Sequence, residues 1–263
     1  MTATAPPPSS SRAVRLNVLD VPTDGQRFDT AISRLIGWAN DAGGRRYVCT
    51  CPVYTLMMGR EQPAVMAALR AADMVAADGM PIVWLQRRLG APFAERVYGP
   101  DLLMELAKRT ADSGLRHVFY GGMPGVPEQL AAALTEKLPG LQVAAAISPP
   151  MQPMGNAPDS AAIEQLNGLN AQIIWVGLGS PKQDLWMAQH RPLLTAPLLI
   201  GVGAAFDMLA GVKRQAPRWM QRSGLEWLFR LAQEPGRLGK RYLVYNPRFV
   251  WLALRRYGLR GRR

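Results

Sequence analysis

The sequence contains few of the residues that build metal centres and disulfide frameworks. Among its 263 residues there are only two cysteines and two histidines. Cys49 and Cys51 are separated by a single residue, which suits neither a disulfide nor a tetrahedral metal site, so we expect free thiols and a reducing compartment. His117 and His190 lie far apart and form no zinc-binding motif, so we interpret each as a packing or surface residue. These absences disfavour zinc hydrolases and histidine-based catalytic triads.

Long apolar segments are also missing. The longest uncharged run, residues 138–158, contains five prolines, and the apolar run at residues 193–206 is too short to span a bilayer. No basic segment followed by an apolar one opens the chain, so no secretion signal is predicted. Residues 1–13 are rich in Pro, Ser and Ala and are predicted to form a disordered tail. If this protein meets a membrane, we expect it to lie on the bilayer surface.

Acidic residues are scarce near the C-terminus. The whole chain has a formal net charge of +12, and residues 213–263, with 14 basic and two acidic side chains, carry all of it. The preceding part of the chain is therefore neutral as a whole. This asymmetry predicts that an anionic partner binds the C-terminal segment.

Apolar β-type runs alternate with helical patterns from residue 16 to residue 207. The pattern predicts a doubly wound, mostly parallel, Rossmann-like α/β sheet in a catalytic domain of residues 14–212, with ligands outside the carboxyl ends of the strands. The predicted strands are 16–21, 47–51, 74–77, 117–120, 142–147, 173–177 and 198–202. The predicted helices are 28–42, 64–72, 81–89, 101–113, 127–138, 161–169 and 182–190.

The alternation stops after Asp207, and residues 213–263 are predicted to form a C-terminal basic helical appendage. Helices are expected at 218–223, 225–234 and 238–256, with breaks at Pro235-Gly236 and Asn246-Pro247. Three tryptophans alternate there with arginines, as in a helix that lies in a membrane interface. The alternative is an ordinary helical layer that exposes a basic face. The excess charge, the tryptophans and the scarcity of acids together favour an anionic membrane surface as partner.

The loop after the predicted strand at 173–177 has the residue types of a phosphate-binding loop. Gly177 and Gly179 allow a close approach of the backbone, and Ser180 is the predicted N-cap of a helix whose first residue is a proline. Lys182 and Gln183 follow. A helix N-terminus placed there would bind a diphosphate or a sugar. The alternative is merely a well-capped helix, and the dinucleotide fingerprint is incomplete because Lys182 stands in place of its third glycine.

A short carboxylate stands at the end of another predicted strand. Asp78 precedes Gly79, which allows a sharp turn, and it can accept a proton from an incoming hydroxyl group. Its alternative role is to cap the following helix. Thr50, at a neighbouring strand end, supplies a hydroxyl group to the same cleft or only fills its strand. Weaker loops with glycines complete the candidate substrate site: Gly122, Gly201, Gly203 and Asp207.

Taken in order, these motifs resemble the WecG/TagA/CpsF family of bacterial glycosyltransferases, glycosyltransferase family 26, over residues 17–256. Each motif alone is a weak match, but their order and the length of the last three make the combination specific. The matching motifs are Ala72-Asp73-Met74-Val75, Asp78-Gly79-Met80-Pro81, Gly121-Gly122, Val176-Gly177-Leu178-Gly179-Ser180-Pro181-Lys182-Gln183, Gly201-Val202-Gly203-Ala204-Ala205-Phe206-Asp207, and Ala216-Pro217-Arg218-Trp219-Met220 with Leu225-Glu226-Trp227-Leu228.

The resemblance implies an inverting, metal-independent transfer of a hexosyl group, N-acetylmannosaminyl or related, from a UDP-sugar to a polyprenyl-diphosphate-linked sugar. It places this reaction at the inner, cytoplasmic face of the membrane, in the synthesis of an exopolysaccharide, teichoic acid or common-antigen type polymer. It also implies that Asp78 is the general base and that Thr50 and Gln183 belong to the site. An arginine of the appendage, Arg237 or Arg241, is expected to hold the diphosphate. No cofactor is expected, and the sequence contains no Asp-x-Asp motif that would hold a metal.

Three alternatives stay open. A basic, tryptophan-bearing segment also suits nucleic acid, but the neutral body and the lack of an RNA-recognition signature favour no nucleic-acid partner. A dinucleotide-dependent oxidoreductase is disfavoured by the incomplete fingerprint. A non-catalytic relative is the third, because Pro52 stands where many family members have asparagine, and Tyr54 where histidine or glutamate is frequent. A homo-oligomer is compatible with the sequence.

Overall fold

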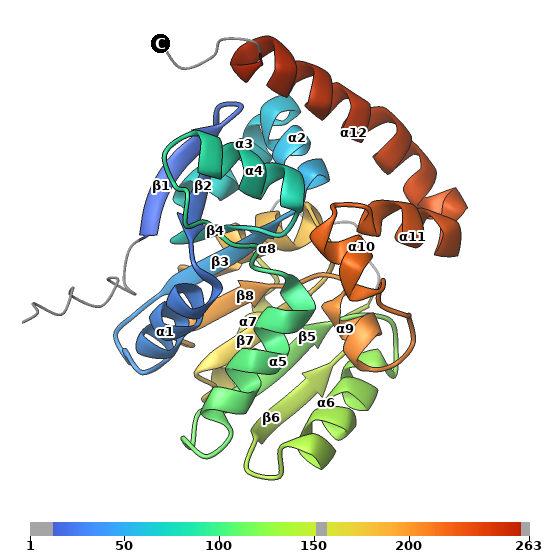
Figure 1. Cartoon of the computed structure of the whole chain (residues 1–263). Coiled ribbons are helices and arrows are strands. Elements are labelled where there is room, and N and C mark those ends of the chain that lie inside the picture. Colours follow the sequence, from blue (N-terminus) through green and yellow to red (C-terminus); the bar gives the residue numbers. More distant parts are fainter. Residues whose placement is uncertain (1–12, 151–156, 259–263) are drawn as a thin grey trace, which may run out of the picture.

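The computed structural model describes residues 13–150 and 157–258, and within them one eight-stranded sheet is flanked by helices (Figure 1). The predicted tail lies outside the described residues except for Ala13, which begins the first strand. The strands are β1 (Ala13–Val18), β2 (Val21–Gln26), β3 (Arg46–Cys51), β4 (Met74–Ala77), β5 (Arg116–Gly121), β6 (Gln142–Ile147), β7 (Ile173–Gly177) and β8 (Leu198–Gly201). Their order in the sheet is β1-β2-β4-β3-β8-β7-β5-β6.

The pairing confirms a mostly parallel, doubly wound sheet. Only β1 and β2 are antiparallel to each other, and the other paired strands are parallel. Parallel strands place their carboxyl ends at one edge, so the loops that follow β3, β4, β5, β7 and β8 meet there. This edge is where the candidate functional residues lie.

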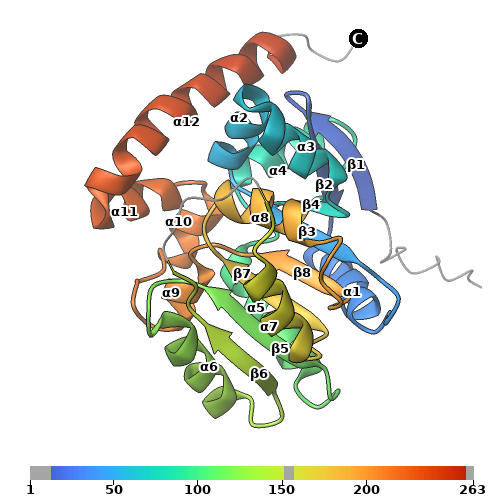
Figure 2. The ribbon, with the colours of Figure 1, turned by 180° about the vertical axis from the view of Figure 1, so that it is seen from behind.

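Helices cover both faces of the sheet (Figures 1 and 2). They are α1 (Phe28–Ala39), α2 (Val53–Glu61), α3 (Pro63–Ala71), α4 (Met80–Arg88), α5 (Gly99–Thr110), α6 (Val126–Lys137), α7 (Ser160–Gly168), α8 (Lys182–His190) and α9 (Ala205–Leu209). Alternate strand residues separate into two buried clusters, with Val118 and Tyr120 in one and Phe119 in the other. Helices α1, α5, α6 and α9 contribute to the Phe119 cluster, and α2, α3, α4, α7 and α8 to the opposite one.

The strand predicted at 16–21 is wrong, because this segment belongs to a hairpin. Leu19 and Asp20 form its two-residue turn with φ angles of +49° and +72°, and Val18 pairs with Val21. Two positive φ values match the twist of flanking antiparallel strands, and glycine or asparagine usually provides them. The Leu-Asp pair gave no such signal, which is why β2 was not predicted.

The remaining predicted strands are confirmed to within one residue at each end, and the predicted helices between them to within three residues. The sequence interpretation missed α2 and α9. Helix α2 begins directly after β3 and contains Val53, Thr55 and Gly59, residue types of low helix propensity. Its stability comes from tertiary packing, since Leu56 and Met57 are fully buried.

The described part of the appendage, residues 213–258, contains three helices, α10 (Arg218–Arg222), α11 (Glu226–Gln233) and α12 (Pro235–Tyr257). The predicted break at Pro235 is confirmed as the start of α12, where a proline is well tolerated. The predicted break at Asn246-Pro247 is wrong, because α12 continues through Pro247. Proline removes one helical hydrogen bond, and the packing of Tyr242 and the core residue Phe249 on either side stabilises the continuous helix.

Basic side chains of the appendage pair with acids of the sheet domain. Ion pairs join Arg218 to Asp101 at 2.7 Å, Arg256 to Asp20 at 2.5 Å and Lys213 to Asp207 at 2.6 Å. A further pair joins Arg248 of α12 to Glu61 of α2. The charge excess of the C-terminal segment therefore serves partly to attach it to the body, which the sequence interpretation did not foresee.

The scarce cysteines and histidines are packing residues. Cys49 and Cys51 are free, buried thiols of one cluster. His117 accepts a hydrogen bond from Trp175 at 3.0 Å, and burial lowers its pKa to about 4. His190 stacks on Trp186, with ring centroids 4.2 Å apart. No helix in residues 13–150 or 157–258 is long and apolar enough to cross a bilayer.

Gly121 is a position where the fold requires glycine. Its φ is +125°, and a Cβ there would lie 2.6 Å from the carbonyl carbon of Gly177. We expect Gly121→Ala to lower the free energy of unfolding by about 2 kcal/mol or more, through backbone strain and overpacking. Gly168→Ala, where a Cβ meets nothing within 4 Å, is the control and should change stability by less than about 1 kcal/mol. Equal urea midpoints for the two variants would contradict this assignment.

Candidate active site

Asp78 lies immediately after β4, at the carboxyl edge of the sheet. Its N–H donates to the carbonyl of Cys51 at 3.1 Å, which joins it to the end of β3. Its carboxylate accepts a hydrogen bond from the N–H of Gly99 at 3.3 Å. The N-cap of α4 is Gly79, and no side chain caps this helix. Asp78 therefore does not have the alternative capping role, and its carboxylate is held at the site by other contacts.

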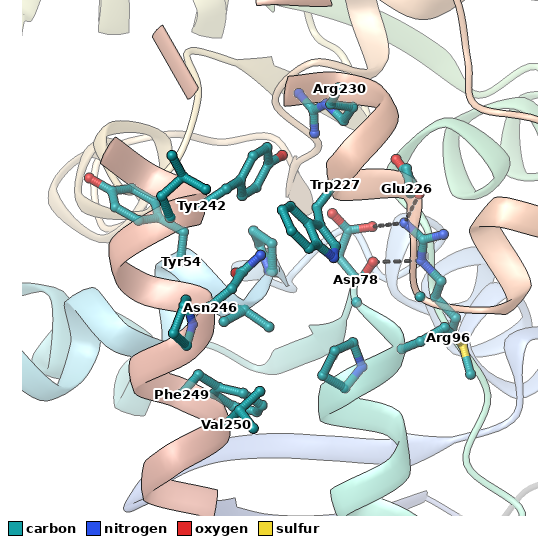
Figure 3. Close-up of a pocket in the computed structure, with 18 of the residues that line it drawn as sticks. Tyr54, Asp78, Arg96, Glu226, Trp227, Arg230, Tyr242, Asn246, Phe249 and Val250 are labelled. Carbon is teal, nitrogen blue, oxygen red and sulfur yellow. Dashed lines mark hydrogen bonds and ion pairs between the residues drawn. The ribbon is translucent and has the colours of Figure 1, made fainter. Parts of the chain in front are cut away.

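An arginine and a second carboxylate surround Asp78 (Figure 3). Arg96, from the segment between α4 and α5, donates from Nε to the Asp78 backbone carbonyl at 2.6 Å. Its Nη2 lies 3.8 Å from Asp78 Oδ1 and 2.6 Å from Glu226 Oε2 of α11. The guanidinium also stacks on the ring of Tyr98, 4.0 Å from its centroid. Arg96 is thus an anchored cation shared between two carboxylates.

The surroundings of Asp78 raise its pKa to about 6. Burial makes the largest contribution and disfavours the charged form, while Arg96 favours that form. The negative charge of Glu226 raises the pKa further, and the Gly99 amide and Arg230 lower it. A carboxylate with this pKa is ionised at neutral pH and is a stronger base than an exposed aspartate, so it can accept a proton from a hydroxyl group.

Asp78 opens into a pocket of about 540 Å³ between the sheet domain and the appendage. The charged lining groups are Asp78, Arg96, Glu226 and Arg230, and a largely apolar wall extends along α12 (Figure 3). The wall faces α2 and α4, which contribute Val53 and Met80. The lining residues of the appendage include Trp227, Tyr242, Leu243, Asn246, Pro247, Phe249, Val250, Trp251 and Leu254.

The glycines predicted from the sequence lie at the ends of β5, β7 and β8. Gly122 donates its N–H to the carbonyl of Gly177 at 3.1 Å, so the loops after β5 and β7 touch. A Cβ on Gly203 would lie 3.8 Å from the Cα of Gly179, so the loops after β7 and β8 touch as well. Gly179 and Gly203 both have positive φ. These loops form a half-buried surface of glycine backbone at the same edge as Asp78.

Thr50 and Gln183 lie beneath this glycine surface. Thr50 is buried and donates its hydroxyl proton to the carbonyl of Gly201 at 2.7 Å. Gln183 donates from Nε2 to the Ser180 hydroxyl at 3.1 Å. Gln183 Oε1 is buried and has no hydrogen-bond partner among the described residues, so it is an acceptor that a ligand can satisfy. The prediction that Ser180 caps α8 is wrong, because the N-cap is Pro181 and Ser180 precedes it.

The other predicted site residues are more dispersed. Asp207 is engaged by Lys213, and Arg237 is exposed and paired with Glu234 at 2.5 Å. Arg241 is half-buried above the ring of Tyr54, 4.3 Å from its centroid. Neither arginine is among the residues that line the pocket. Lys182 is half-buried at the first position of α8.

Sequence reasoning missed several groups that the structure brings to the site. Arg96 and Glu226 pair with each other beside Asp78, and Arg230 lines the same pocket. Glu226 and Arg230 are four residues apart, a spacing that places them on one face of a helix and could have indicated a functional pair. Asp184 was also missed: it is fully buried in the first turn of α8, and burial raises its pKa to about 7. Cys49, Ser180 and Arg241 act against this shift.

No cluster of three or more His, Cys, Asp or Glu side chains with the geometry of a metal site occurs in the part of the chain that the structure describes. The charged groups at the site are instead single carboxylates and arginines. An anionic ligand at this edge would bind to backbone N–H groups, the N-terminus of α8 and guanidinium groups.

A Rossmann-like α/β sheet with a carboxylate and glycine loops at the carboxyl ends of its strands has the ligand site typical of enzymes of this fold class. The sequence profile described as glycosyl transferase WecG/TagA/CpsF family matches residues 16–263, and the chain belongs to this family. It is also similar to the N-acetylglucosaminyldiphosphoundecaprenol N-acetyl-beta-D-mannosaminyltransferase of Bacillus spizizenii. The two are 26% identical over 195 residues, which cover 74% of this chain and 73% of that relative.

The hydrogen bond from the Thr50 hydroxyl to the Gly201 carbonyl links β3 to β8. We expect Thr50→Val, which keeps the shape of the side chain, to lower the free energy of unfolding by about 1 kcal/mol because the buried Gly201 carbonyl loses its donor. Thr50→Ser keeps the donor and should retain most of this stability. Urea unfolding of the purified variants measures the difference. A valine variant as stable as the wild type would show that this hydrogen bond contributes nothing.

Proposed function

We propose that this protein transfers a hexosyl group, N-acetylmannosaminyl or a related sugar, from a UDP-sugar to a polyprenyl-diphosphate-linked sugar, with inversion and without a metal ion. Membership of a glycosyltransferase family supports the reaction class. The name of the Bacillus relative supports the N-acetylmannosaminyl donor group and the lipid diphosphate acceptor. The product would be an intermediate of a cell-surface polysaccharide, such as an exopolysaccharide or a teichoic acid.

One observation carries this proposal: an anchored carboxylate with a raised pKa opens into a largely apolar pocket beside a surface of glycine backbone. In the proposed reaction, Asp78 takes the proton of the acceptor hydroxyl group as its oxygen attacks the anomeric carbon. The bond between that carbon and the diphosphate oxygen breaks, and its electron pair leaves with UDP. The apolar wall along α12 suits the first isoprenyl groups of the acceptor.

The departing diphosphate needs positive charge, and we propose that the protein supplies all of it. Gly177, Gly179, Gly203 and the N-terminus of α8 lie at the same edge as Asp78, and backbone N–H groups there would bind the diphosphate. Arg230 lines the pocket, and Arg241 lies next to it on Tyr54. The lack of an Asp-x-Asp motif supports a reaction without a metal ion. We assign the diphosphate contact to Arg230 and Arg241 in preference to Arg237, which is paired with Glu234.

We further propose that α12 lies on the anionic inner face of the cytoplasmic membrane. Among its basic residues, Val244, Trp251 and Leu254 are 48%, 55% and 61% exposed, and Trp251 and Leu254 also line the pocket, so the exposed apolar strip reaches the pocket. Apolar and basic side chains on one helix face are typical of interfacial helices, and each basic residue near an anionic surface contributes about 1 kcal/mol. This position would bring the mouth of the pocket to the lipid-linked acceptor.

The reaction is tested with purified protein, a panel of UDP-sugars that includes UDP-N-acetylmannosamine, and a lipid-diphosphate acceptor, all in EDTA. We expect one donor to be turned over, and Asp78→Asn to lower kcat by roughly 10²–10⁴-fold because it removes the base without changing its size. Retention of activity in Asp78→Asn would exclude Asp78 as the base. Loss of wild-type activity in EDTA would exclude the metal-independent reaction.

Membrane binding is tested by cosedimentation with vesicles that contain phosphatidylglycerol, and with phosphatidylcholine vesicles as reference. The double variant Val244→Asp, Lys240→Gln changes two exposed residues on one face of α12. We expect it to bind anionic vesicles about tenfold or more weakly, because it loses apolar contact and two units of charge. The matched control Met123→Asp, Lys108→Gln makes the same charge change on the exposed surface of the body and should bind like the wild type. Equal binding by both variants would contradict the proposed orientation.

A further inference from the structure

Two carboxylates lie within ion-pair distance of the single guanidinium group of Arg96. It is fixed from behind by the Tyr98 ring and by its hydrogen bond to the Asp78 backbone carbonyl. From this position its Nη2 is 2.6 Å from Glu226 and 3.8 Å from the Asp78 carboxylate. The closer pair joins the body to the appendage, and the more distant pair lies within the body. The guanidinium of Arg96 is thus shared by both carboxylates but lies closer to Glu226 than to the base.

The two carboxylates come from parts of the molecule with different attachments. Asp78 and Arg96 both belong to the sheet domain, so they remain neighbours whether or not the appendage is in place. Glu226 is the first residue of α11 and reaches Arg96 across the interface between the appendage and the sheet domain (Figure 3). Without Glu226, the Asp78 carboxylate would be the nearest anion left to Arg96, and a closer guanidinium would weaken it as a base.

We propose that Glu226 is a positioning residue that holds the guanidinium of Arg96 away from the Asp78 carboxylate, so that packing of the appendage on the sheet domain activates the catalytic base. This inference rests on the proposed function in one respect, the role of Asp78 as base. In the enzyme the packed appendage then has two effects: it covers the pocket, and through Glu226 it keeps Arg96 from weakening the base. An appendage detached from the body would leave Asp78 neutralised by Arg96 and the enzyme inactive.

The other groups that face Asp78 do not provide this control. Cys51 of β3 and Tyr98 of the loop before α5 stay neutral, because burial raises the pKa of both. The Gly99 amide at the start of α5 is fixed. Arg230 of α11 acts in the opposite direction to Glu226, since its positive charge lowers the pKa of Asp78. Glu226 is the group in this set whose charge both opposes ionisation of Asp78 and draws Arg96 away.

The experiment measures the protonation of Asp78 directly. The full chain is labelled with ¹³C at the aspartate carboxyl groups, and the Asp78 signal is identified by its loss in Asp78→Asn. In the wild type we expect a titration midpoint near pH 6, as the environment of Asp78 predicts. In Glu226→Gln we expect the midpoint to fall by about 0.5 pH units or more, roughly a threefold gain in acidity, because Arg96 turns to Asp78.

A double-mutant cycle separates this role from a simple effect of charge. If Glu226 acts through Arg96, the shift caused by Glu226→Gln should shrink to less than half in the Arg96→Gln background. The control Glu234→Gln removes another appendage carboxylate that pairs with Lys213 and Arg237, and it should leave the Asp78 midpoint unchanged. An unchanged or raised midpoint in Glu226→Gln, or an equal shift in both backgrounds, would overturn the proposal.

Kinetics give a second readout. The pH at which kcat/KM reaches half its maximum should follow the titration midpoint in each variant, and kcat at neutral pH should fall in Glu226→Gln while KM for the donor stays within about twofold. A Glu226→Gln variant in which only KM changes would contradict the role of Glu226 in activating the base. The titration needs no substrate, so a failure of every UDP-sugar to react would exclude the proposed function without affecting the test of Glu226.

Discussion

Parallel strands have their carboxyl ends at the same edge of a sheet, and the candidate site of this protein depends on that constraint. Thr50, Asp78, Gly122, Gly177 and Gly201 are spread over much of the chain, yet each lies at or just after the end of a strand. The ladder pairs β3 with both β4 and β8, which brings Thr50 and Asp78 beside the glycine loops. The connecting helices cover both faces of the sheet and leave the loops at this edge available to a ligand.

The appendage covers that edge, and its basic residues fall into two groups. Some of its basic residues form ion pairs with Asp20, Asp101 and Asp207 of the body, while others project from α12 among exposed apolar side chains. Exposed ion pairs contribute little individually, so the buried side chains of Leu238, Tyr242 and Phe249 carry most of the attachment. One basic segment can therefore be fixed to the body and still present an outer surface that suits an anionic membrane.

Burial at the interface between body and appendage shapes the chemistry as well as the packing. Asp78 has its raised pKa mainly because it is removed from water, and it lies where the appendage meets the sheet domain. The arginines near it keep the ionised form accessible at neutral pH. Asp184, covered completely, has a pKa of about 7 for the same reason. A site assembled from two parts of the chain can thus set the strength of a base through the way those parts meet.

The sequence by itself determined the parallel α/β architecture, most element boundaries, the family resemblance, and the placement of Asp78 and the glycine loops, because local periodicity and strand-end motifs are encoded by neighbouring residues. It did not disclose the β1–β2 hairpin, whose Leu19-Asp20 turn lacks the usual glycine signal, or the continuity of α12 through Pro247. Only the tertiary structure decided the order of the strands and the meeting of Asp78, Arg96 and Glu226. Such contacts join residues far apart in the chain, and the packing of whole elements, rather than any local preference, decides which distant groups become neighbours.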